Sequence, residues 1–313
     1  MRATIVGAGV SGLTTASALL RDGWEVDIIG REMHESAVSM VAGAVWTTTA
    51  ALPANRTQAW AIISWEQFDR LVDDPTCGVS RMRHFEYERN DPGPSTWEST
   101  RFLRRMASDE LPPGYETGFE IDGFIIEPPT YLAWLRDQVT GSGATLSIGE
   151  VERLVDLDGD LVVNCSGLGA SQLVGDDSMY PIRGQVVIVA NPGVQQAISD
   201  ESDIDRIAYL YPRSDDIVLG GVRQTGNFEK QADPATTERI LADCAVLDPR
   251  VAGLDVLDVR VGLRPGRPLV RVEQESLSDG RPVVHNYGHG GAGFILSWGC
   301  AANVRALASE EKQ

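Results

Sequence analysis

The chain has 313 residues, of which 42% are hydrophobic and 23% are charged, and its formal net charge at pH 7 is −18. A chain of this length and composition can bury a hydrophobic core without disulfides or a structural metal. The negative charge repels phosphate backbones and anionic lipid headgroups, which argues against nucleic-acid binding and against binding to a membrane surface. No run approaches the roughly 18–20 apolar residues that a membrane-spanning helix needs.

The cysteines and the N-terminal residues bear on cellular location. The four cysteines are widely scattered and show no CxxC spacing, so we expect reduced core thiols and a cytoplasmic protein. They are Cys77, Cys165, Cys244 and Cys300. Three glycines break the apolar stretch after Met1, and no small-residue cleavage site follows, so we expect no signal peptide.

The N-terminal segment predicts a β-α-β unit. Residues 3–6 form a short apolar run bounded by glycine, which predicts a strand. Leu13, Ala16 and Leu20 recur at helical spacing, and residues 25–29 predict a second strand.

The segment from about 48 to 120 has a different character. It is polar and rich in tryptophan, and runs of proline and glycine interrupt it, so we expect loops there. Regular elements resume afterwards, with a strand at 124–127, a helix that opens at Pro128-Pro129 and stops at Gly141, and a strand at 160–164.

Strands dominate the next part of the chain, where runs rich in β-branched residues are divided by turn signals. These runs are 184–190, 207–211, 217–221 and 256–262. A last strand at 283–287 and a helix from about 294 to 308 complete the pattern. Helix–strand units therefore lie at the start, middle and end, which indicates a discontinuous α/β nucleotide-binding domain with a β-rich domain inserted into it.

A glycine-rich turn links the first predicted strand to the first predicted helix. It reads Gly7, Ala8, Gly9, Val10, Ser11 and Gly12, the GxGxxG pattern. The first glycine allows a tight turn, the second lets the backbone approach a diphosphate, and the third lets the helix pack on the strand. Glu32 lies 20 positions beyond Gly12, where a ribose-binding carboxylate is expected. The pattern predicts dinucleotide binding and leaves FAD and NAD as alternatives.

Several further motifs are spread along the chain. A glycine-dense run at 285–293, HNYGHGGAG, is followed by Gly299 and Ala301. The other motifs are GAGVSGL at 7–13, AGAVW at 42–46, NCSG at 164–167, RGQ at 183–185, LGG at 219–221 and LRPGRP at 263–268. In this order they resemble the D-amino-acid oxidase family over nearly the whole chain.

The resemblance implies a fold and a reaction. It implies a Rossmann-type FAD-binding domain with an inserted β-rich substrate domain, and FAD as the cofactor. The expected partners are a D-amino acid, preferably a neutral one, and O₂; a homodimer is a further possibility. Hydride would pass to flavin N5, the imino acid would hydrolyse to a 2-oxo acid and ammonia, and O₂ would become hydrogen peroxide.

These domains can be given residue ranges. Residues 1–50, 140–182 and 262–313 are assigned to the FAD-binding domain, and residues 51–139 and 183–261 to the substrate-binding domain.

The resemblance also implies roles for three residues at the substrate. Arg264 would clamp the substrate carboxylate, a task that suits the planar guanidinium fork. Tyr209 would hydrogen-bond the same carboxylate, and the Gly291 carbonyl would accept a hydrogen bond from the amine. From the sequence pattern alone, Tyr209 could instead pack in the core, and the nearby Arg267 is expected to be a surface residue rather than a second clamp.

The residues expected to bind FAD come from six parts of the chain. They are Gly7, Ala8, Gly9, Val10, Ser11, Gly12, Arg31, Glu32, Ala42, Gly43, Ala44, Val151, Ser166, Gly290, Gly293, Phe294 and Ile295. We expect no metal site, because the i,i+4 spacing of His285 and His289 would need a helix and this run is too rich in glycine to form one.

Two departures from the family pattern keep alternatives open. Asp205 stands where vertebrate members carry a second active-site tyrosine in a lid-like loop. Arg223 is similar to an arginine of D-aspartate oxidases and could bind a side-chain carboxylate, so a D-aspartate oxidase is the main alternative. A glycine or sarcosine oxidase, an NAD-dependent dehydrogenase and a catalytically silent flavoprotein are more distant ones.

Overall fold

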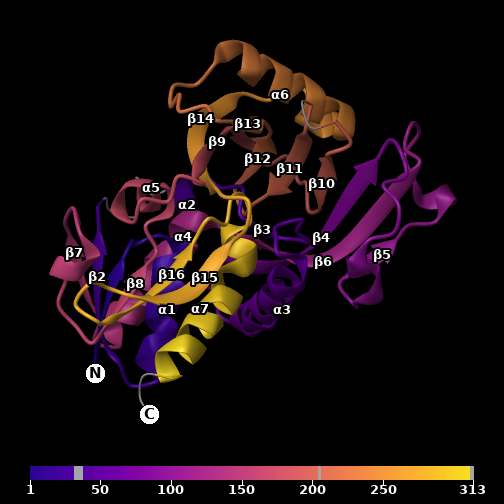
Figure 1. Ribbon diagram of the computed structural model, residues 1–313. Helices are drawn as coiled ribbons and strands as arrows, with labels where there is room; N and C mark the ends of the chain where they lie inside the picture. Colours follow the sequence, from indigo (N-terminus) through magenta and orange to yellow (C-terminus); the bar gives the residue numbers. More distant parts are fainter. Residues whose placement is uncertain (32–37, 204–205, 311–313) are drawn as a thin grey trace.

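Two β-sheets with helices around them make up the fold (Figure 1). The computed structural model describes residues 1–31, 38–203 and 206–310. Glu32, expected to bind ribose, and Asp205, the departure in the lid-like loop, lie outside the described residues. The mixed α/β architecture confirms the fold class that the sequence predicts.

The first sheet has six strands, of which five run parallel to one another. In spatial order they are β15 (Arg271–Ser276), β16 (Pro282–Tyr287), β8 (Leu161–Asn164), β1 (Arg2–Val6), β2 (Glu25–Gly30) and β7 (Thr145–Ile148). Only β15 is antiparallel to its neighbour. The carboxyl ends of the five parallel strands therefore meet at one edge, which is where open α/β sheets bind their ligands.

The β-α-β unit predicted at the N-terminus is confirmed. Helix α1 (Val10–Arg21) connects β1 to β2 and buries Leu13, Ala16 and Leu19 against the sheet and its neighbouring helices. It packs against α7 (Gly293–Glu310) and against α4 (Pro128–Gly141). The predicted start of α4 at Pro128 and its end at Gly141 are also confirmed.

The loops expected between 48 and 120 are partly wrong. This segment contains an 18-residue helix, α3 (Ala54–Leu71), and a ten-residue strand, β4 (Val79–Glu88). The helix buries Trp60, Ser64, Trp65 and Phe68, which recur at helical spacing, so the tryptophans belong to a core-facing helix and not to loops. The prolines and glycines at 92–94 and 112–114 do lie between regular elements.

Helices α3 and α7 approach each other closely. A Cβ on Gly299 would lie 2.2 Å from the Trp60 carbonyl oxygen, and the Gly299 N–H donates to Ser64 Oγ over 3.1 Å. Only glycine fits at this crossing. Neither of these helices, nor any other that the structure describes, is long and apolar enough to span a membrane.

The second sheet has ten strands. Along its main path they are β13 (Gln224–Thr225), β9 (Tyr180–Ala190), β12 (Asp216–Gly220), β11 (Ala208–Pro212), β10 (Ala197–Asp200), β4, β6 (Thr117–Ile126) and β3 (Val45–Trp46). Off this path, β14 (Val256–Gly266) pairs with β9, and β5 (Leu103–Arg105) pairs with β6. The strands predicted between 184 and 262 are confirmed within a few residues at their ends, except that β14 continues to Gly266.

The two faces of the second sheet have different neighbours. On one face Val187, Leu210 and Leu219 pack against α6 (Pro234–Leu247). The sequence analysis predicts only strands in this part of the chain and does not predict this helix. The opposite face carries Tyr209 and Tyr211 and packs on residues that precede and form β3. We call it the tyrosine face. It is turned away from α6, toward the six-stranded sheet (Figure 1).

The chain passes back and forth between the sheets. Strands β3 to β6 lie in the second sheet, β7 and β8 return to the first, β9 to β14 rejoin the second, and β15 and β16 complete the first. This alternation is what an inserted domain requires. The residue boundaries proposed for the two domains remain a prediction.

Candidate active site

The turn between β1 and α1 has room for backbone but not for side chains. Gly7 has a φ of +115°, and a Cβ on it would lie 2.3 Å from the Cys165 carbonyl oxygen. A Cβ on Gly12 would lie 1.8 Å from the Gly7 carbonyl oxygen. Glycine is therefore needed at both positions, as the fingerprint predicts.

The N-terminus of α1 suits an anion. Its capping residue, Gly9, has no side chain to accept from the first N–H groups, although Val10 N–H does donate to Ser39 Oγ over 3.3 Å. Helix α7 begins at Gly293, where a Cβ would lie 3.8 Å from the Val10 side chain. Two helix N-termini thus lie side by side, and their aligned N–H dipoles favour a diphosphate there.

Several other residues expected to bind the dinucleotide lie near the same sheet edge. Ser166 follows β8 and is held by Asn164, whose Oδ1 accepts from the Ser166 hydroxyl over 2.6 Å. Val151 follows β7 and packs beside the end of β1, whereas Arg31 follows β2 and is exposed. The edge accordingly gathers segments from four strands around the two helix N-termini.

Tyr209 is buried on the tyrosine face and has little freedom to move. It stacks on Tyr211 with ring centroids 4.4 Å apart and an interplanar angle of 16°. On its other side, a Cβ on Gly220 would lie 2.0 Å from Tyr209 Cζ, and one on Gly221 would lie 2.6 Å from Cε1. The glycines of the LGG motif therefore make room for this ring.

Arg264 lies beside Tyr209 and is half-buried. Its guanidinium covers Gly184, where a Cβ would lie 2.6 Å from Nη2, and Nη1 donates to the Val222 carbonyl over 3.0 Å. Among the residues described, no carboxylate forms an ion pair with Arg264. A half-buried guanidinium without a protein counter-ion is suited to bind a ligand carboxylate.

The three residues expected at the substrate come together. The Arg264 side chain interacts with the Tyr209 hydroxyl, and its Cδ lies 3.7 Å from where a Cβ on Gly291 would be. Gly290 N–H donates to the Pro265 carbonyl over 2.8 Å, which fixes the glycine-dense run against the Arg264 segment. Gly43 lies against the ring of Tyr211, since a Cβ on Gly43 would be 2.8 Å from Tyr211 Cδ2.

Burial keeps both tyrosines protonated at neutral pH. It raises the pKa of Tyr209, which Arg264 partly offsets, and it raises the pKa of Tyr211 well above its usual value. A protonated Tyr209 hydroxyl can donate a hydrogen bond to a carboxylate.

His84 is a residue of this site that the sequence analysis missed. It lies on β4, packs edge-on against Tyr211 with centroids 5.7 Å apart, and shares hydrogen bonds with Ser199 Oγ at 2.8 Å and Thr47 Oγ1 at 3.0 Å. Burial lowers its pKa to about 4, so the imidazole is neutral. Only the long-range pairing of β4 with β10 brings His84 here, and no local pattern signals it.

The comparisons with known proteins decide the family. The family model described as FAD dependent oxidoreductase, DAO, matches residues 2–307. The chain belongs to this family. The cofactor of this FAD-dependent oxidoreductase is accordingly FAD, and the NAD alternative is set aside.

Related proteins cover nearly the whole oxidoreductase. A D-amino-acid oxidase of Rubrobacter xylanophilus is 45% identical over 98% of this chain and 95% of its own length. One of Streptomyces coelicolor is 38% identical over 97% of this chain and 96% of its own. A human D-aspartate oxidase is 34% identical over 99% of this chain and 95% of its own length.

Solved structures share the fold of the oxidoreductase. The glycine oxidase of Bacillus cereus superimposes with a TM-score of 0.81 at 18% identity, covering all of this chain and 95% of that one. At this identity the likeness shows the architecture and nothing of the substrate.

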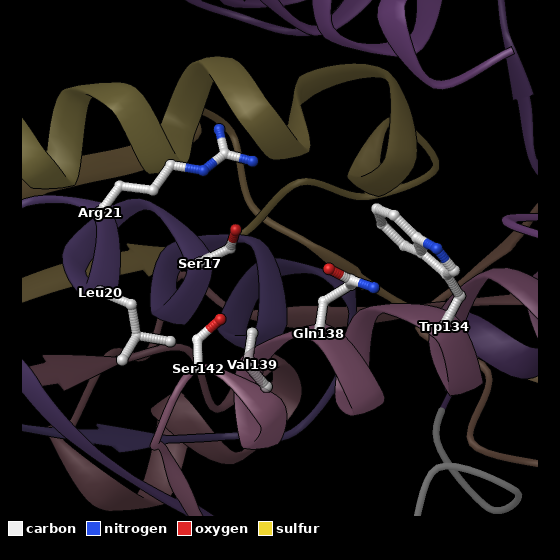
Figure 2. Close-up of a pocket in the computed structure, with 7 residues that line it drawn as sticks. All are labelled: Ser17, Leu20, Arg21, Trp134, Gln138, Val139 and Ser142. Atoms are coloured by element: carbon white, nitrogen blue, oxygen red, sulfur yellow. The ribbon is translucent and has the colours of Figure 1, made fainter. Parts of the chain in front are cut away.

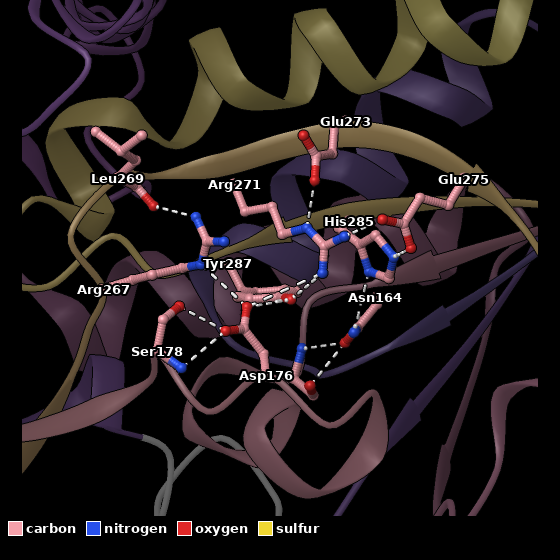
Figure 3. Close-up of polar contacts among 11 residues, drawn as sticks. Asn164, Asp176, Ser178, Arg267, Leu269, Arg271, Glu273, Glu275, His285 and Tyr287 are labelled. Atoms are coloured by element: carbon pink, nitrogen blue, oxygen red, sulfur yellow. Dashed lines mark hydrogen bonds and ion pairs between the residues drawn. The ribbon is translucent and has the colours of Figure 1, made fainter.

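Arg267 of the oxidoreductase is not a second clamp. Its Nε donates to Asp176 Oδ2 over 3.0 Å, and Tyr287 donates to the same oxygen over 2.8 Å (Figure 3). Arg271 in turn donates to the Tyr287 hydroxyl over 2.6 Å. Arg267 thus tethers the segment that carries Arg264 to the six-stranded sheet, and it is only partly exposed.

Arg223 lies one residue after the carbonyl that binds Arg264, but it is exposed to solvent. It follows β12 in the connection to β13. The side chain is near the candidate substrate site but outside the tyrosine face.

A pocket of about 180 Å³ lies elsewhere in the oxidoreductase, between the carboxyl-terminal halves of α1 and α4 (Figure 2). Its lining is Ser17, Leu20, Arg21, Trp134, Gln138, Val139 and Ser142. None of the expected site residues is among them, because the dinucleotide turn lies at the opposite end of α1. Nor does the described part of the chain contain a group of three potential metal ligands.

Proposed function

We propose that this oxidoreductase oxidises D-amino acids. The substrate Cα–H bond breaks with transfer of hydride, the amine becomes an imine, and water then releases a 2-oxo acid and ammonia. Bound FAD would supply the hydride acceptor for this oxidation, with O₂ as the final electron acceptor that is reduced to hydrogen peroxide. The observation that carries the proposal is the half-buried Arg264 guanidinium beside the Tyr209 hydroxyl and Gly291.

The protein's task is to bind and orient the substrate. Arg264 and Tyr209 would hold the carboxylate by charge-assisted hydrogen bonds, and the Gly291 carbonyl would accept from the amine. With both groups fixed, only one enantiomer presents its Cα–H toward the cofactor, and we propose that this is the D-isomer. Relatives named D-amino-acid oxidase at 45% and 38% identity support the assignment.

We favour neutral D-amino acids over acidic ones such as D-aspartate as the substrate class. The relative named D-aspartate oxidase is less similar, at 34% identity, than the two relatives above. Arg223, which motivates the acidic alternative, is exposed and therefore well hydrated, so it offers a side-chain carboxylate little net stabilisation.

We propose the remaining FAD contacts and the cellular setting on the same basis. Gly7 to Gly12 and Gly293 would surround the diphosphate, and Gly43 and Gly290 would lie along the flavin. The four cysteines are buried and unpaired, which supports a cytoplasmic, reducing location. We also propose that the six-stranded sheet and its helices form a Rossmann-type domain that binds the cofactor. Light scattering would test whether the protein is a homodimer.

Peroxide release by the FAD-loaded protein tests the proposal. A panel of D- and L-amino acids with D-aspartate and sarcosine should give turnover with D-isomers and none with L-isomers. Arg264→Ala should abolish it, whereas Arg260→Ala, a partly exposed arginine on the same strand that pairs with Asp258, should not. Turnover confined to D-aspartate and lost in Arg223→Ala would favour the acidic alternative, and silence with every D-isomer would refute the proposal.

A further inference from the structure

Three residues on neighbouring strands form a row on the tyrosine face. Tyr209 of β11 is directly opposite Ser199 of β10, and Ser199 is directly opposite Glu86 of β4. The strands β11, β10 and β4 lie next to one another in the sheet (Figure 1). Residues that are directly opposite across strands point to the same face of a sheet. Glu86 therefore shares a face with Tyr209, about 10 Å away from Cα to Cα, since neighbouring strands are about 4.8 Å apart.

The surroundings of Glu86 confirm that it faces the site. His84, two residues earlier on β4, lies on the same face and contacts Tyr211. Glu86 and Glu201 both act electrostatically on the Tyr211 hydroxyl, and Glu201 also acts on Tyr209. The half-buried Glu86 carboxylate has no hydrogen bond or ion pair with any residue in the part of the chain described.

Once Glu86 is ionised, the site carries opposite charges at its two ends. Arg264 lies at one end of the tyrosine face, and Glu86 lies beyond Tyr209 at the other. Burying a carboxylate without a partner is costly, so such a group is suited to bind a cation from outside the protein.

We propose that Glu86 is a specificity-determining residue that pairs with the distal cation of a long D-amino acid, such as the ammonium of D-lysine. This rests on the proposed function, since Arg264 must hold the other end of the substrate. The inference extends the substrate class from neutral D-amino acids to those with a long cationic side chain.

The charge on Glu86 changes with pH between about 7 and 9, a range in which enzyme activity can be measured. Burial, Glu201 and Glu88 together raise the pKa of Glu86 to about 8, so its negative charge develops as the pH rises from 7 to 9. Of the other groups on this face, His84 stays neutral and both tyrosines stay protonated because they are buried, whereas burial also raises the pKa of Glu88. Arg105, on the far side of β6, is paired with Glu98 and Asp91.

The test compares D-lysine with D-norleucine, which has a side chain of similar length but no charge. In the FAD-loaded wild type, the ratio of kcat/KM for D-lysine to that for D-norleucine should rise between pH 7 and 9. Glu86→Gln should lower this ratio at pH 9 about tenfold, mainly through KM, and remove its pH dependence. Glu116→Gln, an exposed glutamate just before β6 that is not among the groups that raise the pKa of Glu86, should leave the ratio unchanged.

A binding measurement complements the kinetics. 6-Aminohexanoate should raise the melting temperature of the wild type more than hexanoate does, and Glu86→Gln should abolish that difference. An unchanged ratio in Glu86→Gln, or an equal effect of Glu116→Gln, would overturn the inference. If D-norleucine is oxidised in that case, the proposed function stands without it; if no D-isomer is oxidised, the proposed function itself fails.

Discussion

Arg264 lies directly over Gly184, and a Cβ on Gly184 would come within 2.6 Å of Nη2 and 2.7 Å of Cζ. The two residues lie on paired strands, β14 and β9, and the missing side chain on one creates the space for the guanidinium of the other. The position of the proposed carboxylate clamp therefore depends on the absence of a side chain at Gly184.

Gly184→Ala should displace the Arg264 guanidinium without unfolding the protein, because the group that must move is the end of a flexible side chain. We expect kcat/KM for neutral D-amino acids to fall about 100-fold, the cost of misplacing a binding group by about 1 Å. Steady-state kinetics measure this, and the melting temperature should stay within a few degrees of the wild type. Gly141→Ala, where a Cβ meets nothing within 4 Å, is the matched control.

Gly7→Ala should impair FAD binding and folding together. The new Cβ would meet the carbonyl oxygen of Cys165, which is backbone and cannot move aside, and a φ of +115° disfavours alanine. The ratio of flavin to protein absorbance after purification should drop severely. Gly149→Ala, which makes only ordinary contact with Ile29, should retain its flavin; equal retention by Gly7→Ala would contradict the role of this turn.

Tyr209→Phe removes one hydroxyl and keeps the ring that stacks on Tyr211. Losing a hydrogen bond to a carboxylate costs about 1.5–3 kcal/mol, so KM should rise about tenfold or more. Because burial raises the pKa of Tyr209, the wild-type pH profile should show no loss of activity from tyrosine ionisation below about pH 10. Tyr87→Phe, on the opposite face of β4, provides the comparison.

Asp176→Asn should destabilise the protein in a pH-dependent way. Burial alone would raise the pKa of Asp176, but hydrogen bonds from Ser178, Tyr287 and Arg267 outweigh it and hold the pKa below its usual value. A carboxyl group with a lowered pKa stabilises the fold above its unfolded-state pKa of about 3.9, and this stabilisation is lost as the pH falls further.

The loss in unfolding free energy for Asp176→Asn should therefore be about 3 kcal/mol at pH 7, the cost of leaving a partly buried arginine without its partner. It should shrink below pH 4. Denaturant titrations at pH 7 and pH 3.5 measure both values, and a pH-independent difference would count against the charge of Asp176 as the cause.

The sequence predicts the cofactor half of the molecule well because its signals are local. Gly7 and Gly12 are needed for a turn within one β-α-β unit, so their spacing alone indicates the structure. The proline-containing segment at 263–268 marks two arginines, and only the resemblance to the family singles out Arg264. Such features can be predicted because they depend on residues close together in the chain or on segments of unusual composition.

The missed features depend on residues far apart in the chain. Glu86 and His84 reach the tyrosine face only because β4 pairs with β10, more than 100 residues later, and strand register cannot be read from either segment alone. Helix α3 was different, since Trp60, Ser64 and Phe68 do recur at helical spacing. The helical spacing of these residues could have been found in the sequence, but the many tryptophans and polar residues of this segment led to a prediction of loops.

The pairing of α1 with α7 has a consequence for the order of events during synthesis. The two helix N-termini that meet at the dinucleotide turn come from opposite ends of the chain, at Val10 and Gly293. A nascent chain still on the ribosome at residue 280 would expose the GxGxxG turn with half of its surroundings missing. FAD capture should then have to wait until α7 has been synthesised, although the turn itself is among the first segments of the chain to be made.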